Sequence, residues 1–156
     1  MKDYVRRLLE KHGLNTNITD ELRELGVGFP EDYREVELPL HGLLLLAVFG
    51  KRPCSDVELI LDNLPPRMAE CEFEMRDVYI RTFPLHIAAA KGAPRSIIER
   101  MLLVAPKAVR KKDYFGDLPL HRAARTENTD AIELLMDAYP EAVLEGEIGV
   151  GLHFIL

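Results

Sequence analysis

The sequence of 156 residues contains no tryptophan, two cysteines and two serines. Cys54 and Cys71 are too far apart for a CxxC pair, so they indicate buried thiols in a reducing compartment rather than a disulfide framework. The longest apolar run, residues 43–49, is much shorter than the roughly 20 residues that span a bilayer. Residues 1–11 lack the apolar h-region of a secretory signal. We therefore expect an intracellular, cytoplasmic protein without membrane insertion.

Positive charge is in deficit, with 20 lysines and arginines against 26 aspartates and glutamates and a net charge of −6. An acidic total argues against a general nucleic-acid binder, for which a basic footprint is the first requirement. Residues 91–130 differ from the rest, with nine basic residues against five acidic ones. This stretch could steer an acidic partner. A solvated face is the other interpretation and the one that we favour.

The motifs of the common catalytic sites are missing. The sequence has no phosphate-binding P-loop, no G-x-S-x-G, no G-x-G-x-x-G and no HExxH. Both serines stand at expected helix starts, and nothing in the sequence brings either cysteine to a histidine. Carboxylate pairs such as Glu72 and Glu74 are interpreted as solvated charges. We expect no enzyme, no cofactor and no metal site.

Three Pro-Leu-His tripeptides divide the sequence into similar units. They are Pro39-Leu40-His41, Pro84-Leu85-His86 and Pro119-Leu120-His121, and residues 151–153 contain a degraded fourth copy. The histidines are separated by 45, 35 and 32 residues. Self-similarity at such spacings is typical of repeat proteins. Because proline is favoured in the first turn of a helix, each tripeptide predicts a helix start.

Two further marks follow each tripeptide in the same order. The first is a capping-box pattern, in which a serine or aspartate and a glutamate three residues later satisfy free backbone N–H groups. It begins at Ser55, Ser96 and Asp130. The second is a helix-ending proline 10 or 11 residues later, at Pro66, Pro106 and Pro140. Each unit is therefore predicted to contain two short helices, which are marginal alone in water and must stack on their neighbours, as in a solenoid.

These residues resemble the ankyrin repeat, whose signature is T-P-L-H-x-A at a period near 33 residues. Residues 84–89 and 119–124 match it closely, and the usual threonine is replaced by Leu38, Phe83 and Leu118. The combination of L-P-L-H with Y-P-E-A-V at residues 139–143 is similar to a subtype of ankyrin proteins in diatoms, other algae and protists.

The resemblance implies an all-α ankyrin-repeat solenoid of helix-turn-helix units with short β-hairpin loops. Repeats are expected over about 31–69, 70–109 and 110–143, with the start of a fourth over 144–156. Residues 1–30 are expected to form an N-terminal helical cap whose second helix is capped by Thr19. Apolar and charged residues alternate over 72–76, which indicates an enlarged β-hairpin at 70–82. A tolerated loop without functional consequence is the alternative.

The resemblance also implies roles for individual residues. In the family the tripeptide histidine orders the hairpin by hydrogen bonding to backbone, so His41, His86 and His121 are interpreted as structural. Partner-binding positions are the hairpin tips and the inward face of each first helix. In the second and third units these are Tyr79, Ile80, Thr82, Ala90, Lys91, Tyr114, Phe115, Asp117, Arg125 and Thr126, and in the first unit the loop offers Arg34, Glu35 and Glu37. Aromatic tips beside arginine are typical of binding hot spots, and packing on adjacent hairpins is the alternative.

We therefore expect a protein–protein interaction module, an adaptor or scaffold that binds another protein through its hairpin tips and concave face. Two alternatives remain open: a structural subunit of a large multiprotein assembly, and a regulatory ankyrin fragment of a longer enzyme. The apolar Leu152, Phe154, Ile155 and Leu156 favour these alternatives, because terminal repeats normally need a polar outer face. A native chain that continues past Leu156 is the simpler expectation.

Overall fold

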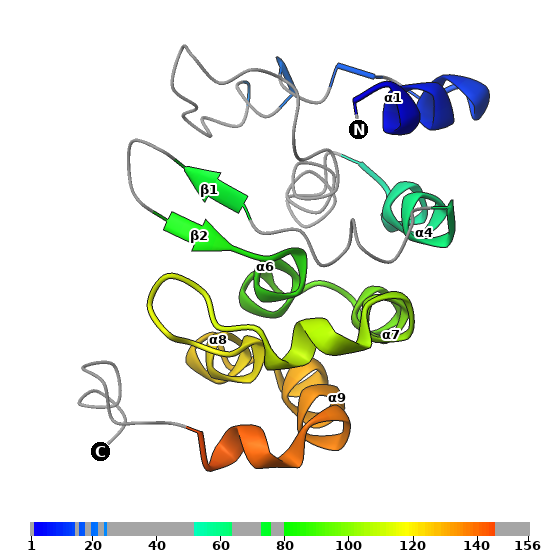
Figure 1. Ribbon diagram of the computed structural model, residues 1–156. Helices are drawn as coiled ribbons and strands as arrows, with labels where there is room; N and C mark the ends of the chain where they lie inside the picture. Colours follow the sequence, from blue (N-terminus) through cyan, green and yellow to red (C-terminus); the bar gives the residue numbers. More distant parts are fainter. Residues whose placement is uncertain are drawn as a thin grey trace.

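The computed structural model of the chain describes residues 2–14, 16–17, 20–21, 24, 52–63, 73–75 and 80–145. Over these residues the protein is mostly helical, which confirms the prediction of a helical fold (Figure 1). Much of the first expected repeat and all but two residues of the expected fourth repeat lie outside the described residues. So do several residues singled out from the sequence, namely Arg34, Glu35, Glu37, Pro39, His41, Pro66 and Tyr79.

The elements follow one another as two single helices, a β-hairpin and two helix pairs. Helix α1 spans Lys2–Lys11 and α4 spans Cys54–Asn63. Strands β1 (Phe73–Met75) and β2 (Ile80–Thr82) pair antiparallel. The pairs are α6 (Pro84–Lys91) with α7 (Arg95–Val104), and α8 (Pro119–Arg125) with α9 (Thr129–Ala138). The 3₁₀ helices η1 (Pro106–Arg110) and η2 (Pro140–Val143) follow α7 and α9.

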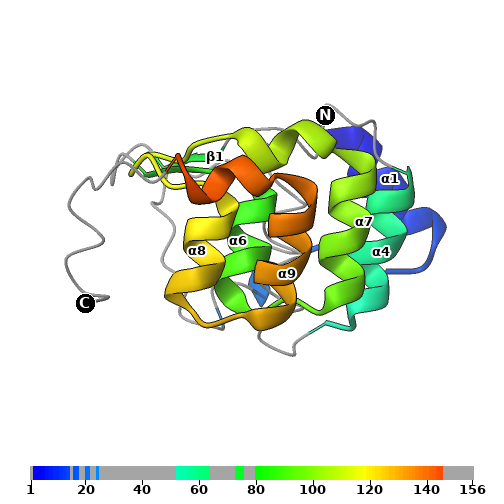
Figure 2. The ribbon, with the colours of Figure 1, turned by 90° about the horizontal axis from the view of Figure 1, so that it is seen from below.

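The helices pack in two layers. Helices α6 and α8 lie side by side in one layer, and α4, α7 and α9 form a row in the other (Figure 2). Helix α7 contacts α4 and α9, α8 contacts α6 and α9, and α1 packs against α4. Each helix of 7 to 10 residues is thus held by its neighbours, as short helices require.

Helices α6 and α8 begin in the same way. Phe83 and Leu118 have extended backbones and bury their side chains, and the proline that follows each one occupies the first helical turn, where its missing N–H group costs no hydrogen bond. Helix α6 ends at Lys91 and is followed by Gly92, whose φ of +72° lies in the left-handed region that glycine adopts without a Cβ clash. The Gly92 N–H group donates to the carbonyl of Ala88.

The predicted capping boxes are wrong. Helices α4, α7 and α9 begin one residue before Ser55, Ser96 and Asp130, which therefore lie inside the first turn. Helix α7 has Pro94 at its N-cap, with no side-chain cap, and α9 is capped by Asn128, whose Oδ1 accepts from the Ala131 N–H group at 3.2 Å. Pro94 and Asn128 do not fit the pattern of a serine or aspartate followed by glutamate, so that pattern does not predict these starts.

Pro106 and Pro140 stand where the sequence predicts the second helices to end. Helix α7 ends at Val104 and α9 ends at Ala138, two residues before each proline. Each proline then opens a 3₁₀ helix, η1 or η2, which the sequence analysis did not foresee. These turns bury Ala108 in η1 and Ala142 in η2 at equivalent places.

The core lies between the two layers and repeats along them. Leu85 on α6 and Leu120 on α8 occupy equivalent places, as do Met101 on α7 and Leu135 on α9, and all four are buried. Burying one such side chain stabilises the fold by about 1.5–3 kcal/mol. The alanines Ala88 and Ala123 are fully buried and allow α6 and α8 to approach closely.

At the N-terminal side, Leu8 and Leu9 of α1 join the core cluster. Further along, residues 20, 21 and 24 are helical. Before them, Oδ1 of Asn17 accepts from the Asp20 N–H group at 3.3 Å, as an N-cap side chain does. The cap predicted at Thr19 falls on a residue outside the described ones.

Ion pairs join the outer helices on their solvent side. Arg100 on α7 binds Asp62 on α4 through two hydrogen bonds of 2.5 Å, and Arg95 on α7 binds Glu133 on α9 at 2.8 Å. The hydrogen bond from Arg100 lowers the pKa of Asp62 below its usual 3.8. Because these side chains are about half exposed, the pairs fix orientation more than they stabilise the fold.

Candidate protein-binding site

The loop between η1 and α8 is a tight turn whose tip is formed by Tyr114 and Phe115. The Gly116 N–H group donates to the Asp113 carbonyl at 3.0 Å, and the Asp113 N–H group donates to the Asp117 carbonyl at 2.9 Å. Gly116 has a φ of +78°, which favours glycine. A turn followed by a left-handed glycine is a common hairpin connection.

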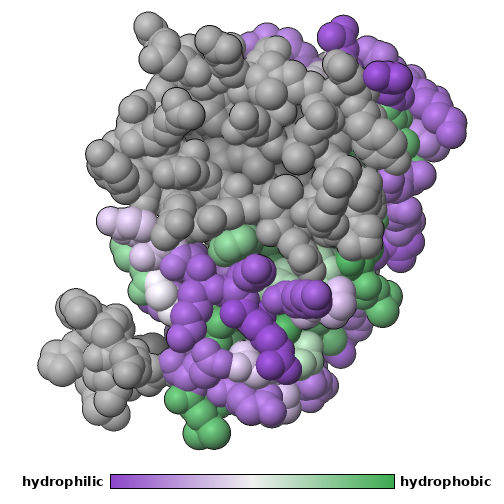
Figure 3. All heavy atoms as spheres, in the orientation of Figure 1, coloured by the Kyte–Doolittle hydropathy of each residue, from purple (hydrophilic) through white to green (hydrophobic). Residues whose placement is uncertain are grey.

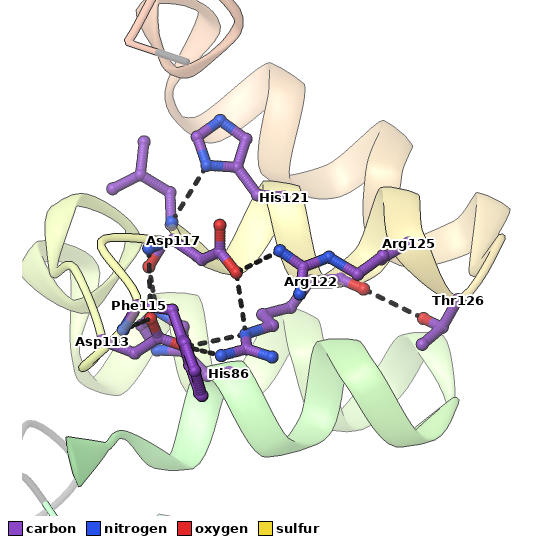
Figure 4. A network of polar contacts seen from close by, with 9 residues as sticks. His86, Asp113, Phe115, Asp117, His121, Arg122, Arg125 and Thr126 are labelled. Atoms are coloured by element: carbon purple, nitrogen blue, oxygen red, sulfur yellow. Dashed lines mark hydrogen bonds and ion pairs between the residues drawn. The ribbon is translucent and has the colours of Figure 1, made fainter. Parts of the chain in front are cut away.

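Asp113 holds this turn from the inside, since only 1% of its side chain is exposed. Its Oδ1 accepts from the backbone N–H groups of Phe115 at 2.9 Å and Asp117 at 3.1 Å. Its Oδ2 accepts from Nε of Arg122 on α8 at 2.7 Å and also from Nη2 of that residue (Figure 4). One carboxylate therefore fixes the tip to the helix that follows it.

Asp117 lies between two arginines of α8. Nη2 of Arg125 donates to its Oδ2 at 2.5 Å, and Nε of Arg122 lies 3.4 Å from the same oxygen (Figure 4). Asp117 and Arg125 are predicted from the sequence as separate residues of the binding face, and the structure brings them together as an ion pair. Arg125 remains the more accessible, with 45% of its side chain exposed against 16% for Asp117.

The tip aromatics are the most prominent apolar groups of this loop. Tyr114 is 50% exposed and Phe115 59%. Their rings meet edge to face with centroids 5.3 Å apart, and the guanidinium carbon of Arg122 lies 5.0 Å from the Phe115 ring centroid. These contacts hold both rings in place while leaving large parts of them in solvent, so the tip is a rigid apolar feature on the surface.

The tripeptide histidines His86 and His121 hydrogen bond to backbone carbonyls. Nε2 of His86 donates to the Asp117 carbonyl at 2.9 Å, in the loop of the next helix pair. Nε2 of His121 donates to the Ala142 carbonyl in η2 at 3.2 Å, and its Nδ1 accepts from the Leu118 N–H group at 3.1 Å. A carbonyl can only accept, so each ring carries its proton on Nε2.

His86 lies in the more buried setting of the two. It is 1% exposed, and its Nδ1 has no hydrogen-bond partner among the residues that the structure describes. Burial lowers the pKa of His86 below its usual 6.5, because the charged ring loses its hydration. The hydrogen bond to the Asp117 carbonyl and the nearby Asp113 act in the opposite direction but do not reverse the shift. The folded protein therefore favours the neutral ring.

The other contact residues predicted for the repeat over 70–109 lie at the ends of β2 and α6. Ile80 is in β2 opposite Met75, and Thr82 is in β2 opposite Phe73. Lys91 ends α6 and is exposed, and Ala90 before it is half-buried.

Thr126 follows α8 and is exposed, and its hydroxyl also contacts backbone carbonyls of α8 and α6. Its hydroxyl lies 3.1 Å from the Arg122 carbonyl and 3.4 Å from the Ala89 carbonyl of α6. Nδ2 of Asn128 donates to the same Ala89 carbonyl at 3.2 Å, which joins the two helix pairs. Asn128 was missed from the sequence because its contact partner is 39 residues away.

Basic side chains precede the tip along the chain, and they are not among the binding residues predicted from the sequence. Lys107 and Arg110 of η1 are exposed, as are Lys111 and Lys112 directly before the turn. Hydrophilic residues gather over η1 and this loop on the face shown in Figure 3. Their signal in the sequence was the basic excess of residues 91–130, which we interpreted as a solvated face.

The described residues form neither a candidate metal site nor a membrane-spanning helix. Among them, no group of three His, Cys, Asp or Glu side chains is placed to hold a metal ion. Over the same part of the chain, every helix is too short or too polar to cross a membrane.

No protein-family model matches the chain, and no curated protein sequence matches it.

Proposed function

We propose that this protein is a protein–protein interaction module of the ankyrin-repeat type that binds its partner through the tip at Tyr114 and Phe115. The adjoining surface of α8, at Arg125, extends the contact. The fold serves as a rigid support for these residues and performs no catalysis.

The exposure of the tip aromatics is the observation that carries this proposal. Large aromatic side chains dominate binding energies at protein interfaces, and arginine is enriched beside them. Tyr114 and Phe115 are half exposed and lie outside the core cluster, so stability of the fold does not account for their presence in the described structure. Asp113 and Arg122 hold the tip in one conformation, which reduces the entropy that binding must overcome.

The repeat assignment has separate support. The helix pairs α6–α7 and α8–α9 place Leu85 with Leu120 and Met101 with Leu135 at equivalent buried positions. Stacked helix pairs with projecting loops are the architecture in which such tips form a continuous binding surface.

A permanent structural subunit is the second candidate. Met136 of α9, Val143 of η2 and Leu144 directly after it are exposed apolar side chains. Among the described helices, α9 and η2 lie at the opposite end of the stack from α1 (Figure 1). A subunit that packs this end against a neighbour would bury them.

The proposal is tested by purifying partners on the tagged chain and repeating the capture with a variant that carries Tyr114→Ala and Phe115→Ala. A specific partner that is lost with the variant supports the module. A partner that is retained by the variant but lost on Met136→Ser with Leu144→Ser supports the subunit.

A further inference from the structure

We infer that the segment bound at this tip is an acidic peptide that carries an aromatic or large aliphatic side chain. The inference rests on the proposed function and adds to it the chemistry of the partner. The apolar side chain would contact Tyr114 and Phe115, and the carboxylates would lie over Lys107 and Lys111.

The charge around the tip is opposite to that of the whole chain. Residues 106–125 contain six basic and two acidic residues, in a protein of net charge −6. Both acidic residues already have cationic partners, since Asp113 binds Arg122 and Asp117 binds Arg125 and lies near Arg122. The positive excess is therefore not neutralised within this segment.

Two of the lysines are available to a partner. Lys107 and Lys111 are exposed, and neither forms an ion pair within the part of the chain that the structure describes. Lys112 already has a partner, since its Nζ lies 3.3 Å from a Glu145 carboxylate oxygen. Arg110 also has one, since its guanidinium carbon lies 4.3 Å from the Tyr139 ring centroid. Unpaired lysines on η1 and in the loop that leads to the aromatic tip offer a carboxylate-rich segment charge complementarity, and the tip offers it an apolar anchor.

A protein segment suits this surface better than a nucleic acid does. Nucleic acids carry closely spaced charges over a long distance, and the 24 acidic residues outside this segment would repel them. A short acidic peptide needs only the local positive region. The chain's own segment 131–145 has four acidic residues and no basic one, so a second copy of the chain is another occupant that the experiment must distinguish.

The experiment begins with a random 12-residue peptide library displayed on phage and selected against the immobilised full chain. We expect the selected peptides to be enriched in Asp and Glu together with Phe, Leu or Tyr. A selected peptide is then synthesised with a fluorescent label, and its affinity is measured by fluorescence polarisation for wild type and for Lys111→Glu. Lys11→Glu is the matched control, because Lys11 is also an exposed lysine and lies at the end of α1.

Lys111→Glu should weaken peptide binding about fivefold or more at low salt, and Lys11→Glu should leave it unchanged. Added NaCl should weaken binding to wild type by screening these charges. A peptide in which every Glu and Asp is replaced by Gln and Asn should lose most of its affinity.

Several outcomes would overturn the inference. One is that the library yields only neutral or basic peptides, or no binding peptide at all. Another is that the peptide with Gln and Asn in place of Glu and Asp binds as tightly as the acidic peptide. A third is that a poly-uridine oligonucleotide binds more tightly than the acidic peptide. Light scattering that shows a dimer of wild type and a monomer of Lys111→Glu would assign the surface to a second copy of the chain. Partner capture that depends on Tyr114 and Phe115 but not on Lys111 would reject the acidic partner and keep the proposed function.

Discussion

Nε2 of His86 and the backbone carbonyl of Asp117 lie 2.9 Å apart, although 31 residues separate them in the chain. This hydrogen bond joins α6, which carries His86, to the loop that leads into α8. His121, at the equivalent position of α8, instead bonds to Ala142 in the 3₁₀ turn of its own pair. The residue equivalent to Asp117 in the next unit lies outside the described residues. The same tripeptide thus supports two different backbone contacts.

Stability should fall as the pH is lowered through the usual pKa of histidine. Because burial holds the pKa of His86 below 6.5 in the folded protein, the unfolded chain binds a proton between the two pKa values that the folded chain does not. The unfolding free energy contributed by His86 is therefore complete above pH 6.5, decreases below it, and stops decreasing once the pH is below the folded pKa. Urea unfolding between pH 7.5 and 5 measures this change.

The folded pKa of His86 can be followed separately by NMR of its imidazole ring, with the urea-unfolded chain as reference. The Asp62 carboxyl does not interfere, since its lowered pKa affects stability only below its usual 3.8. A folded His86 that titrates at or above the unfolded value would contradict the burial that we describe.

Asp113→Ala should destabilise the fold by about 2–4 kcal/mol, because it leaves two backbone N–H groups and a largely buried arginine without their acceptor. Asp113→Asn keeps an acceptor for the N–H groups and should cost less. Chemical denaturation measures both losses. Equal stability of Asp113→Ala and wild type would mean that the turn does not depend on this carboxylate.

The ion pair between Arg100 and Asp62 should contribute little by comparison. Its side chains are 42% and 43% exposed, so water and salt screen the attraction in spite of the two short hydrogen bonds. In a double-mutant cycle with Arg100→Ala and Asp62→Ala, the coupling should be several times smaller than the effect of Asp113→Ala, and it should vanish at 1 M NaCl. A large coupling that resists salt would show that the pair is better shielded than its exposure indicates.

The helical character and the positions of the second helices could be predicted from the sequence because the tripeptides and the prolines act locally. Pro84 and Pro119 begin α6 and α8, and Pro106 and Pro140 follow the ends of α7 and α9. The N-caps of α7 and α9 were placed two residues late, at Ser96 and Asp130 instead of Pro94 and Asn128, because a cap is recognised by geometry as well as by residue type.

The internal links of the site could not be predicted from the sequence. The pairing of Asp113 with Arg122 joins a turn to a helix nine residues on, and no periodicity marks it. Asp117 and Arg125 were chosen as separate contacts because the sequence does not reveal that they bind each other. The exposed aromatic tip could be predicted, since the resemblance to the ankyrin repeat implies that Tyr114 and Phe115 lie at a hairpin tip.

Tyr114→Ala together with Phe115→Ala should weaken partner binding by about 2–4 kcal/mol, because aromatic tips of this kind dominate the binding energy at an interface. The fold should change little, since both side chains are half exposed and outside the core cluster. Leu103→Ala is the matched control, because Leu103 is 81% exposed and lies on α7, in the other layer. That control should bind as wild type does.

The most direct measurement is therefore a titration of the purified partner, identified by capture on the wild-type chain, into wild type, the Tyr114→Ala/Phe115→Ala variant and Leu103→Ala. Our account predicts a Kd that rises by about 30-fold or more in the double variant, the equivalent of 2 kcal/mol, and an unchanged Kd for Leu103→Ala. Wild-type affinity in a folded double variant would contradict it.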